Sequence, residues 1–244
     1  MKLLISNNGK TFLVRDETKE FHSQYGYVGP KDLQAEPGSI IETNTGHKLS
    51  VIDPGIIDLR MKMKRGAQII PSKDVGFIIS ETGLCKKSTV IDAGAGSGGL
   101  CLTLAFLVKK VYTFDVRDDH LEIVRKNKDF LGLTNLSVKK GDVYADKLPK
   151  DIDLVTLDVP EPWEALDNIF NALKPGGFLV TYSPSIPQVS DTVEALHGHS
   201  GLVYQKTVEI LEREWEFSGR KIRPKTQQRI GHSGFLTFAR KMRK

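Results

Sequence analysis

VIDAGAGSGG, residues 90–99, is the stretch that decides the fold of this 244-residue chain. It begins with an apolar run that closes at Asp92, and four glycines separate that run from the apolar stretch at 100–108. Glycines permit the positive φ angles of a tight turn and let a ligand lie against backbone N–H groups where a helix begins. The stretch therefore predicts a strand, a ligand-binding turn and a helix.

The chain after residue 70 alternates between strand-like and helix-like patterns. Helices are predicted at 74–80, 100–108 and 118–130, and strands at 89–94, 111–116, 136–139, 152–158, 178–182 and 202–210. Alternation at this spacing favours an α/β fold with a doubly wound, mostly parallel sheet. Ligands bind such sheets beyond the carboxyl ends of the strands, so residues at those ends are the candidates for a functional site.

The chain up to residue 64 has a different pattern. An Asn-Gly pair lies between two apolar runs in KLLISNNGKTFLV, residues 2–14. This is the signal of a β-hairpin, because a type I′ turn needs positive φ. A second turn signal lies at Asn44–Gly46. We therefore predict a small β-rich, barrel-like domain at 1–64 and an α/β domain at 65–244.

Composition excludes several classes of protein. Hydrophobic residues make up 39% and charged residues 27% of the chain, which is typical of a globular protein. No apolar stretch has the roughly 18 residues that a membrane-spanning helix needs. Two cysteines exclude a disulfide framework and a cysteine-rich zinc site, and no metal is expected. The apolar start of the chain is too short for a secretory signal, so we expect a cytoplasmic protein.

Charge is unevenly distributed along the chain, whose formal net charge is +5. Residues 218–244 hold nine Lys or Arg and no Asp or Glu, whereas residues 142–168 hold eight acidic residues and two Lys. The basic segment fits a polyanion such as nucleic acid, although a solvated basic terminus has the same composition. The candidate RNA-binding residues are Arg220, Lys221, Arg223, Lys225 and Arg229.

Acidic residues follow three of the predicted strands. Asp115 closes the strand after the glycine-rich turn, where an acidic side chain binds a cofactor ribose in dinucleotide folds as well as in methyltransferases. Asp142 follows the next strand. It is a candidate cofactor-binding residue, and the alternative interpretation is that it is only a residue of the turn. Asp158 closes the strand DLVTLD, and the prolines at 160 and 162 stiffen the connection that follows it.

The glycine spacing Gly94-x-Gly96-x-Gly98 differs from that of dinucleotide-binding turns and resembles motif I of class I S-adenosylmethionine-dependent methyltransferases. Four longer stretches resemble the tRNA adenine-N1 methyltransferases of archaea and bacteria, and the likeness spans residues 65–244, most of the chain. They are RGAQIIPSKDVGFI at 65–78, DVPEPW at 158–163, YSPSIPQV at 182–189, and REWEFSGRKIRPKTQQRIGHSGFLTFARK at 213–241.

The resemblance implies a Rossmann-like methyltransferase domain with a seven-stranded sheet, S-adenosylmethionine as cofactor, a T-loop adenine of tRNA as acceptor, and a homotetramer. Asp158 is the implied catalytic residue. The implied cofactor-binding residues are Gly94, Ala95, Gly96, Ser97, Gly98, Gly99, Leu100, Asp115, Val116, His120, Asp142, Val143 and Asp158. The chain departs from the family at Asp115, where relatives usually carry Glu, and at Pro71, where they tend to carry an aromatic residue.

The implied chemistry is consistent with a lone carboxylate at Asp158. N1 of adenosine already has an available lone pair, so no proton must be removed before it attacks the methyl group. Positive charge then spreads to the exocyclic amino group, and a fixed carboxylate that accepts its N–H stabilises the transition state. Two alternatives are a class I methyltransferase with another acceptor (a protein isoaspartate or a corrinoid precursor) and a non-catalytic RNA-binding subunit.

Overall fold

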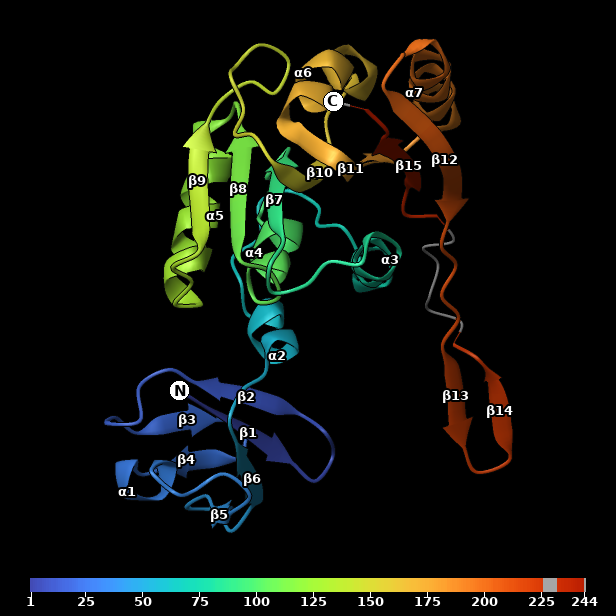
Figure 1. The fold of residues 1–244 in the computed structure, drawn as a ribbon. Helices are drawn as coiled ribbons and strands as arrows, with labels where there is room; N and C mark the ends of the chain where they lie inside the picture. Colours follow the sequence, from blue (N-terminus) through green and yellow to red (C-terminus); the bar gives the residue numbers. More distant parts are fainter. Residues whose placement is uncertain (226–231, 244) are drawn as a thin grey trace. The chain divides into compact units, whose positions relative to one another are not determined.

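The computed structural model describes residues 1–225 and 232–243, and the chain divides into two compact units, Met1–Met63 and Lys64–Lys244 (Figure 1). No helix among the described residues is long and apolar enough to cross a membrane. Of the candidate RNA-binding residues, Arg229 lies outside the described residues.

The smaller unit is built on an antiparallel sheet of four strands in the order β2-β1-β6-β5, and the hairpin predicted from Asn-Gly is present as β1 and β2. The sheet is open, with β2 and β5 at its edges, whereas a barrel-like form was predicted. The elements are β1 (Lys2–Ser6), β2 (Thr11–Val14), β3 (Phe21–Ser23), β4 (Gly26–Val28), α1 (Pro30–Leu33), β5 (Ile40–Glu42), β6 (Lys48–Ile52) and α2 (Ile56–Met61).

The larger unit is built on a seven-stranded sheet, which confirms the predicted fold class. Its strand order is β12 (Leu202–Glu209), β15 (Phe235–Lys241), β11 (Leu173–Ser183), β10 (Ile152–Leu157), β7 (Thr89–Ala93), β8 (Lys110–Asp115) and β9 (Leu136–Lys140). β15 is antiparallel to both neighbours, and the other strands are parallel to one another.

The helices of this unit are α3 (Ser72–Thr82), α4 (Gly99–Ala105), α5 (Asp118–Phe130), α6 (Leu166–Ala172) and α7 (Ile186–Gly198), with a short 3₁₀ helix at Pro162–Ala165. α4 and α5 pack against β8 and β9, while α6 and α7 pack against β11 (Figure 1). The predicted bounds of α5 are confirmed, because Leu121 and Val124 give it one buried face. α4 ends three residues before its predicted end, since Phe106 and Leu107 are exposed.

β7 lies at the topological switch point of the sheet. After β7 the chain adds β8 and β9 on one side, and it then returns to place β10 on the other side of β7. The connections that leave β7 and β10 therefore run in opposite directions, which opens a crevice at their carboxyl ends. This is where the glycine-rich turn and Asp158 lie.

Two local features differ from the prediction. The strand predicted at 178–182 begins earlier in the structure, because Leu173–Gly177 is an irregular part of β11, with a shift of register against β10 between Ile152 and Leu154. Trp215–Ser218 (β13) and Lys221–Pro224 (β14) form an antiparallel hairpin that was not predicted. The sequence signals of this hairpin are the alternating apolar residues Trp215 and Phe217 and the Ser-Gly turn.

Candidate functional site

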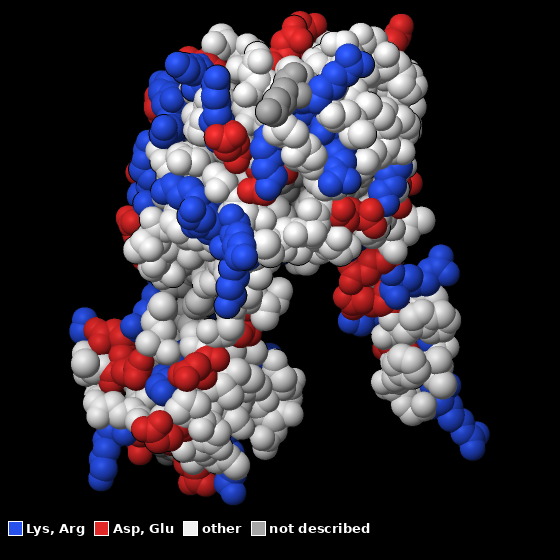
Figure 2. All heavy atoms as spheres, viewed as in Figure 1, with Lys and Arg blue, Asp and Glu red and all other residues white. Residues whose placement is uncertain are grey.

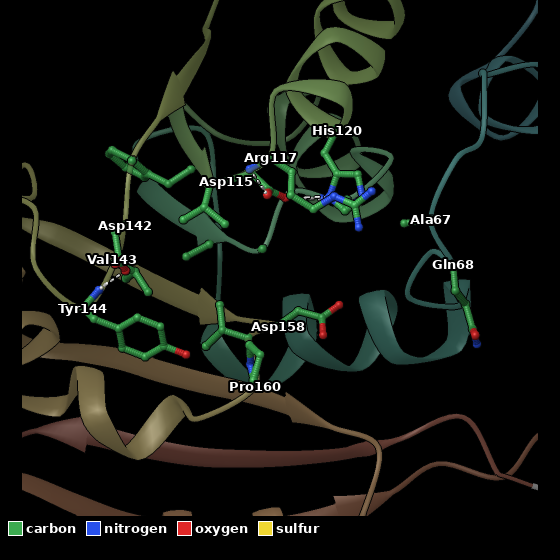
Figure 3. Close-up of a pocket in the computed structure, with 17 residues that line it drawn as sticks. Ala67, Gln68, Asp115, Arg117, His120, Asp142, Val143, Tyr144, Asp158 and Pro160 are labelled. Carbon is green, nitrogen blue, oxygen red and sulfur yellow. Dashed lines mark hydrogen bonds and ion pairs between the residues drawn. The ribbon is translucent and has the colours of Figure 1, made fainter.

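A cavity of about 360 Å³ lies at the switch point, beyond the carboxyl ends of β7, β8, β9 and β10 (Figure 3). Its volume and its mainly apolar lining with a few polar groups are typical of a site for a small organic ligand. The predicted residues that line it are Gly94, Gly96, Asp115, Val116, His120, Asp142, Val143 and Asp158.

Gly94 begins the glycine-rich turn directly after β7. Its φ is +86°, and a Cβ at this position would lie 2.0 Å from the carbonyl oxygen of Asp158. No side chain fits in that space, so glycine is required for the close approach of the turn to the end of β10. The glycine-rich turn and the end of β10 therefore meet at this contact.

Asp115 is held by three hydrogen bonds at the end of β8. The backbone N–H groups of Gly96 and Arg117 donate to its two carboxylate oxygens over 3.1 and 2.9 Å. His120 Nδ1, 3.0 Å from Oδ2, is the donor of the third because a carboxylate only accepts. The carboxylate is thereby fixed against the turn.

Asp142 lies on the opposite wall, after β9. The N–H of Tyr144 donates to its Oδ1 over 2.9 Å (Figure 3). The N–H of Asp142 itself donates to Asp146 over 2.8 Å. Asp142 is thus a turn residue and a cavity residue at once, and one of its two oxygens makes no hydrogen bond with a described residue. Val143 beside it is buried, and Val116 exposes an apolar surface to the cavity.

Asp158 follows β10 directly, and its N–H donates to the carbonyl of Ala93 over 2.9 Å. Its carboxylate points into the cavity and accepts no hydrogen bond from the described residues (Figure 3). The side chain is exposed to solvent where it faces the cavity, and the neighbouring protein removes part of its hydration. This desolvation, aided by the charge of Asp115, raises the pKa of Asp158 to about 6.

Asp92 is a second carboxyl group below the turn. It is 3% exposed, and Thr156 Oγ1 donates to it over 2.7 Å. Burial raises its pKa to about 7, and the charge of Asp158 acts in the same direction. Two carboxyl groups with raised pKa values therefore lie at the ends of neighbouring strands.

The remaining predicted cofactor residues are distributed unevenly. Ala95, Ser97, Gly99 and Leu100 line a smaller cavity of about 20 Å³ that shares Gly94, Gly96 and Asp158 with the main one. Gly98 lines neither cavity. It begins α4 with a φ of +83°, and a Cβ there would lie 2.5 Å from Leu102, so its role is in the backbone turn.

Sequence reasoning missed several cavity residues. They are Ala67, Gln68, Ala93, Phe114, Arg117, Gly141, Tyr144, Val159 and Pro160. Most of them neighbour a predicted residue and follow from the rule that strand ends line the site. Ala67 and Gln68 come from a distant stretch without periodicity. Their only sequence signal was the resemblance of residues 65–78 to the family.

The basic residues of the hairpin are largely paired with acidic residues of the same hairpin. Glu216 forms ion pairs with Lys221 at 3.2 Å and with Arg223 at 3.4 Å, and Lys225 pairs with Glu214. Arg220 has no carboxylate partner among the described residues. Figure 2 shows acidic and basic side chains mixed on this part of the chain, which is less cationic than its Lys and Arg content predicted.

Comparisons with known proteins agree with this geometry. The family model described as "tRNA methyltransferase complex GCD14 subunit" matches residues 59–227. The tRNA (adenine(57)-N(1)/adenine(58)-N(1))-methyltransferase TrmI of Methanocaldococcus jannaschii is 36% identical, over 98% of this chain and 94% of its own. The tRNA (adenine(58)-N(1))-methyltransferase TrmI of Thermus thermophilus is 35% identical, over 98% and 96%.

Two solved structures are similar over the whole chain. A structure titled as an S-adenosylmethionine-dependent O-methyltransferase from Thermotoga maritima has a TM-score of 0.85 and 30% identity, and covers 100% of this chain and 93% of its own. The tRNA (m1A58) methyltransferase TrmI of Aquifex aeolicus has a TM-score of 0.79 and 25% identity, with 100% and 97% covered.

Proposed function

This chain belongs to the family of tRNA adenine-N1 methyltransferases, and from that premise we propose that it transfers a methyl group from S-adenosylmethionine to N1 of an adenine in tRNA. The names of the relatives favour adenine 58, with adenine 57 as a second acceptor. The observation that carries the proposal is the pairing, in one cavity, of a fixed carboxylate, Asp115, with an unpartnered one, Asp158.

The donor end of the cavity fits S-adenosylmethionine. Asp115 offers two oxygens to ribose hydroxyls, Asp142 offers an acceptor to the adenine amino group, and Val116 and Val143 offer apolar surface to the adenine ring. The glycine-rich turn leaves backbone close to the methionine end. When bound, the cofactor supplies an electrophilic methyl group on a sulfonium.

At the acceptor end of the cavity, after β10, Asp158 is the charged residue among the described lining residues. Asp158 accepts a hydrogen bond from the exocyclic amino group of the target adenine, and its negative charge stabilises the positive charge that develops as N1 attacks the methyl group. The partial desolvation that raises its pKa also strengthens this interaction, because it lowers the local dielectric. The protein otherwise acts by aligning the two reactants.

A base within a structured tRNA loop must leave its stack to reach Asp158, and contacts with phosphates supply the energy. We propose that Arg220 and the paired residues Lys221, Arg223 and Lys225 supply part of these contacts, with Glu214 and Glu216 released or displaced on binding. Arg229 belongs to the same segment and to the same proposal.

The family also implies a homotetramer, which we include in the proposal. The hairpin of β13 and β14 supports it, because Trp215, Phe217 and Ile222 are exposed in the single chain and a second copy would bury them. Light scattering after size exclusion measures the mass directly. A monomer at micromolar concentration would contradict this part of the proposal.

The activity is tested by incubating the purified chain with an unmodified tRNA transcript and methyl-labelled S-adenosylmethionine. Nucleoside digestion and chromatography then identify the labelled product. We expect 1-methyladenosine, and transcripts with adenine 57 or 58 replaced identify the acceptor. Label in a 2′-O-methyl nucleoside, or no label in RNA at all, would overturn the proposal and favour another acceptor.

A further inference from the structure

The stretch at residues 64–70, here called the wall segment, lines the site although it forms neither helix nor strand. Ala67 and Gln68 line the main cavity, and Gln68, Ile69 and Ile70 line the smaller one. Irregular backbone of this kind needs partners for its N–H and C=O groups from outside the segment. Two buried side chains provide them.

Ser97, in the glycine-rich turn, binds the middle of the wall segment. Its hydroxyl accepts hydrogen bonds from the N–H groups of Gly66 and Ala67, each over 2.9 Å, and donates to the carbonyl of Ala67 over 2.8 Å. Ser97 is 1% exposed, so all the hydrogen-bonding capacity of the hydroxyl is used within the protein.

Asn127, in α5, binds the start of the wall segment and connects it to the turn. Its Oδ1 accepts from the N–H of Lys64 over 2.8 Å, and its Nδ2 donates to the carbonyls of Lys64 and Ser97 over 2.9 and 3.1 Å. Asn127 is also 1% exposed. One side chain thus joins the wall segment, α5 and the glycine-rich turn.

The glycines of the turn provide the space for this contact. A Cβ on Gly99 would lie 2.7 Å from Cβ of Ile69, and one on Gly96 would lie 3.5 Å from Cβ of Ala67. A Cβ on Gly66 would meet Ile123 of α5 at 2.5 Å. Part of the glycine content of the turn therefore admits the protein's own backbone and not only a ligand.

From these contacts we infer that Ser97 and Asn127 are positioning residues for the methyl donor, an inference that rests on the proposed function. They hold the wall segment against the turn, so that Ala67 and Gln68 close one side of the donor cavity. The side chain of Ser97 acts on the donor through this wall and does not bind it directly. Donor binding and the closed wall therefore stabilise each other, as linkage requires.

The test measures donor affinity and wall closure in Ser97→Ala and Asn127→Ala in the full chain. Calorimetry gives the dissociation constant for S-adenosylmethionine, and trypsin cleavage after Lys64 and Arg65 reports opening of the wall. We expect affinity to fall about tenfold and cleavage to accelerate in both variants. In the wild type, saturating S-adenosylmethionine should slow this cleavage.

Two variants control for loss of stability alone. Asn135→Ala removes a side chain whose Nδ2 also donates to two backbone carbonyls, those of Ala105 and Val108, away from the wall. Ser88→Ala removes a buried hydroxyl before β7, which accepts the N–H of Cys85. We expect both to lower the thermal midpoint while donor affinity and cleavage after Arg65 stay as in the wild type.

The outcomes separate the two claims. If the wild type binds S-adenosylmethionine and both wall variants bind it equally well, or if the donor does not slow cleavage, the positioning role is wrong and the proposed function stands. If the wild type binds no S-adenosylmethionine, the proposed function itself fails. If Asn127→Ala does not fold, Ser97→Ala, which removes only one oxygen, still decides the question.

Discussion

The donor end and the acceptor end of the cavity each contain an aspartate that follows a parallel strand, yet their surroundings are opposite. Asp115 accepts three hydrogen bonds from Gly96, Arg117 and His120. Asp158 accepts none from the described residues, and its pKa is raised to about 6. Under the proposed function, this difference gives one residue type two roles: the carboxylate with three hydrogen bonds orients the methyl donor, and the one without gains its partner when the target adenine binds.

The largest expected effect is that of Asp158→Asn. The variant keeps the shape of the side chain and removes the negative charge that stabilises the positive charge on the adenine. We expect kcat to fall by at least about a hundredfold, as for the loss of other preorganised electrostatic groups. The dissociation constant for S-adenosylmethionine should stay unchanged in calorimetry. A variant within tenfold of the wild-type kcat would show that the acceptor end does not work as proposed.

Asp115→Asn should have the opposite effect on the two quantities: it should weaken the binding of S-adenosylmethionine and leave kcat nearly unchanged. It weakens the hydrogen bonds from two backbone N–H groups and replaces one ribose acceptor, so the affinity for S-adenosylmethionine should fall about ten- to a hundredfold. At saturating donor, kcat should remain close to that of the wild type. Asp119→Asn is the matched control, because Asp119 is exposed and its ion-pair partner among the described residues is Arg117. An equal loss of affinity for S-adenosylmethionine in Asp115→Asn and Asp119→Asn would contradict the specific role of Asp115 at the donor end of the cavity.

The pH dependence of kcat/KM tests the raised pKa of Asp158. An ordinary aspartate stays ionised down to about pH 4, whereas Asp158 becomes protonated as the pH falls through about 6. We therefore expect kcat/KM to fall about tenfold per pH unit below that value. Removing the charge in Asp115→Asn should move this limb to lower pH, since Asp115 helps to raise the pKa.

Asp92 provides the control for that profile, because its pKa is also raised, to about 7. Asp92→Asn should keep an acidic limb if Asp158 is its source. Loss of the limb in this variant would assign the titration to Asp92 instead.

The smallest expected effect concerns the hairpin of β13 and β14, which is the proposed contact surface for the phosphates of the RNA. Glu216→Gln releases Lys221 and Arg223 from their ion pairs and should strengthen tRNA binding, whereas Arg220→Gln should weaken it. Each change should alter affinity by a few-fold and the slope of log K against log salt by about one. Filter binding over a series of KCl concentrations measures both. An unchanged slope in both variants would exclude the hairpin as a phosphate-contacting surface.

Much of the fold was predictable because the residues that build it have regular patterns. The apolar periodicity of 118–130 fixed one buried helix face, and the apolar runs before Asp92, Asp115 and Asp158 marked buried parallel strands whose ends meet at one edge. The wall segment has no such pattern. Its position depends on hydrogen bonds from Ser97 and Asn127, thirty or more residues away in sequence, which no local rule detects.

The count of charged residues in the sequence was the least reliable guide to the electrostatics of the folded chain. Counting Lys and Arg at 218–244 missed Glu214 and Glu216, which lie just outside that window and fold back onto the cations as part of the hairpin. Similarly, the raised pKa values of Asp92 and Asp158 depend on enclosure by distant strands. A sequence shows which groups can ionise, and only the fold shows how much water they retain.

The contact between Gly94 and the carbonyl of Asp158 has a consequence for how this enzyme can change over time. Main chain lies against main chain there, so the spacing between the glycine-rich turn and the end of β10 is set by the backbone and not by the surrounding side chains. Substitutions elsewhere in the cavity can then retune which molecules enter it while the reaction geometry stays in place. Such a separation lets one scaffold explore new acceptors without first losing the ability to transfer a methyl group.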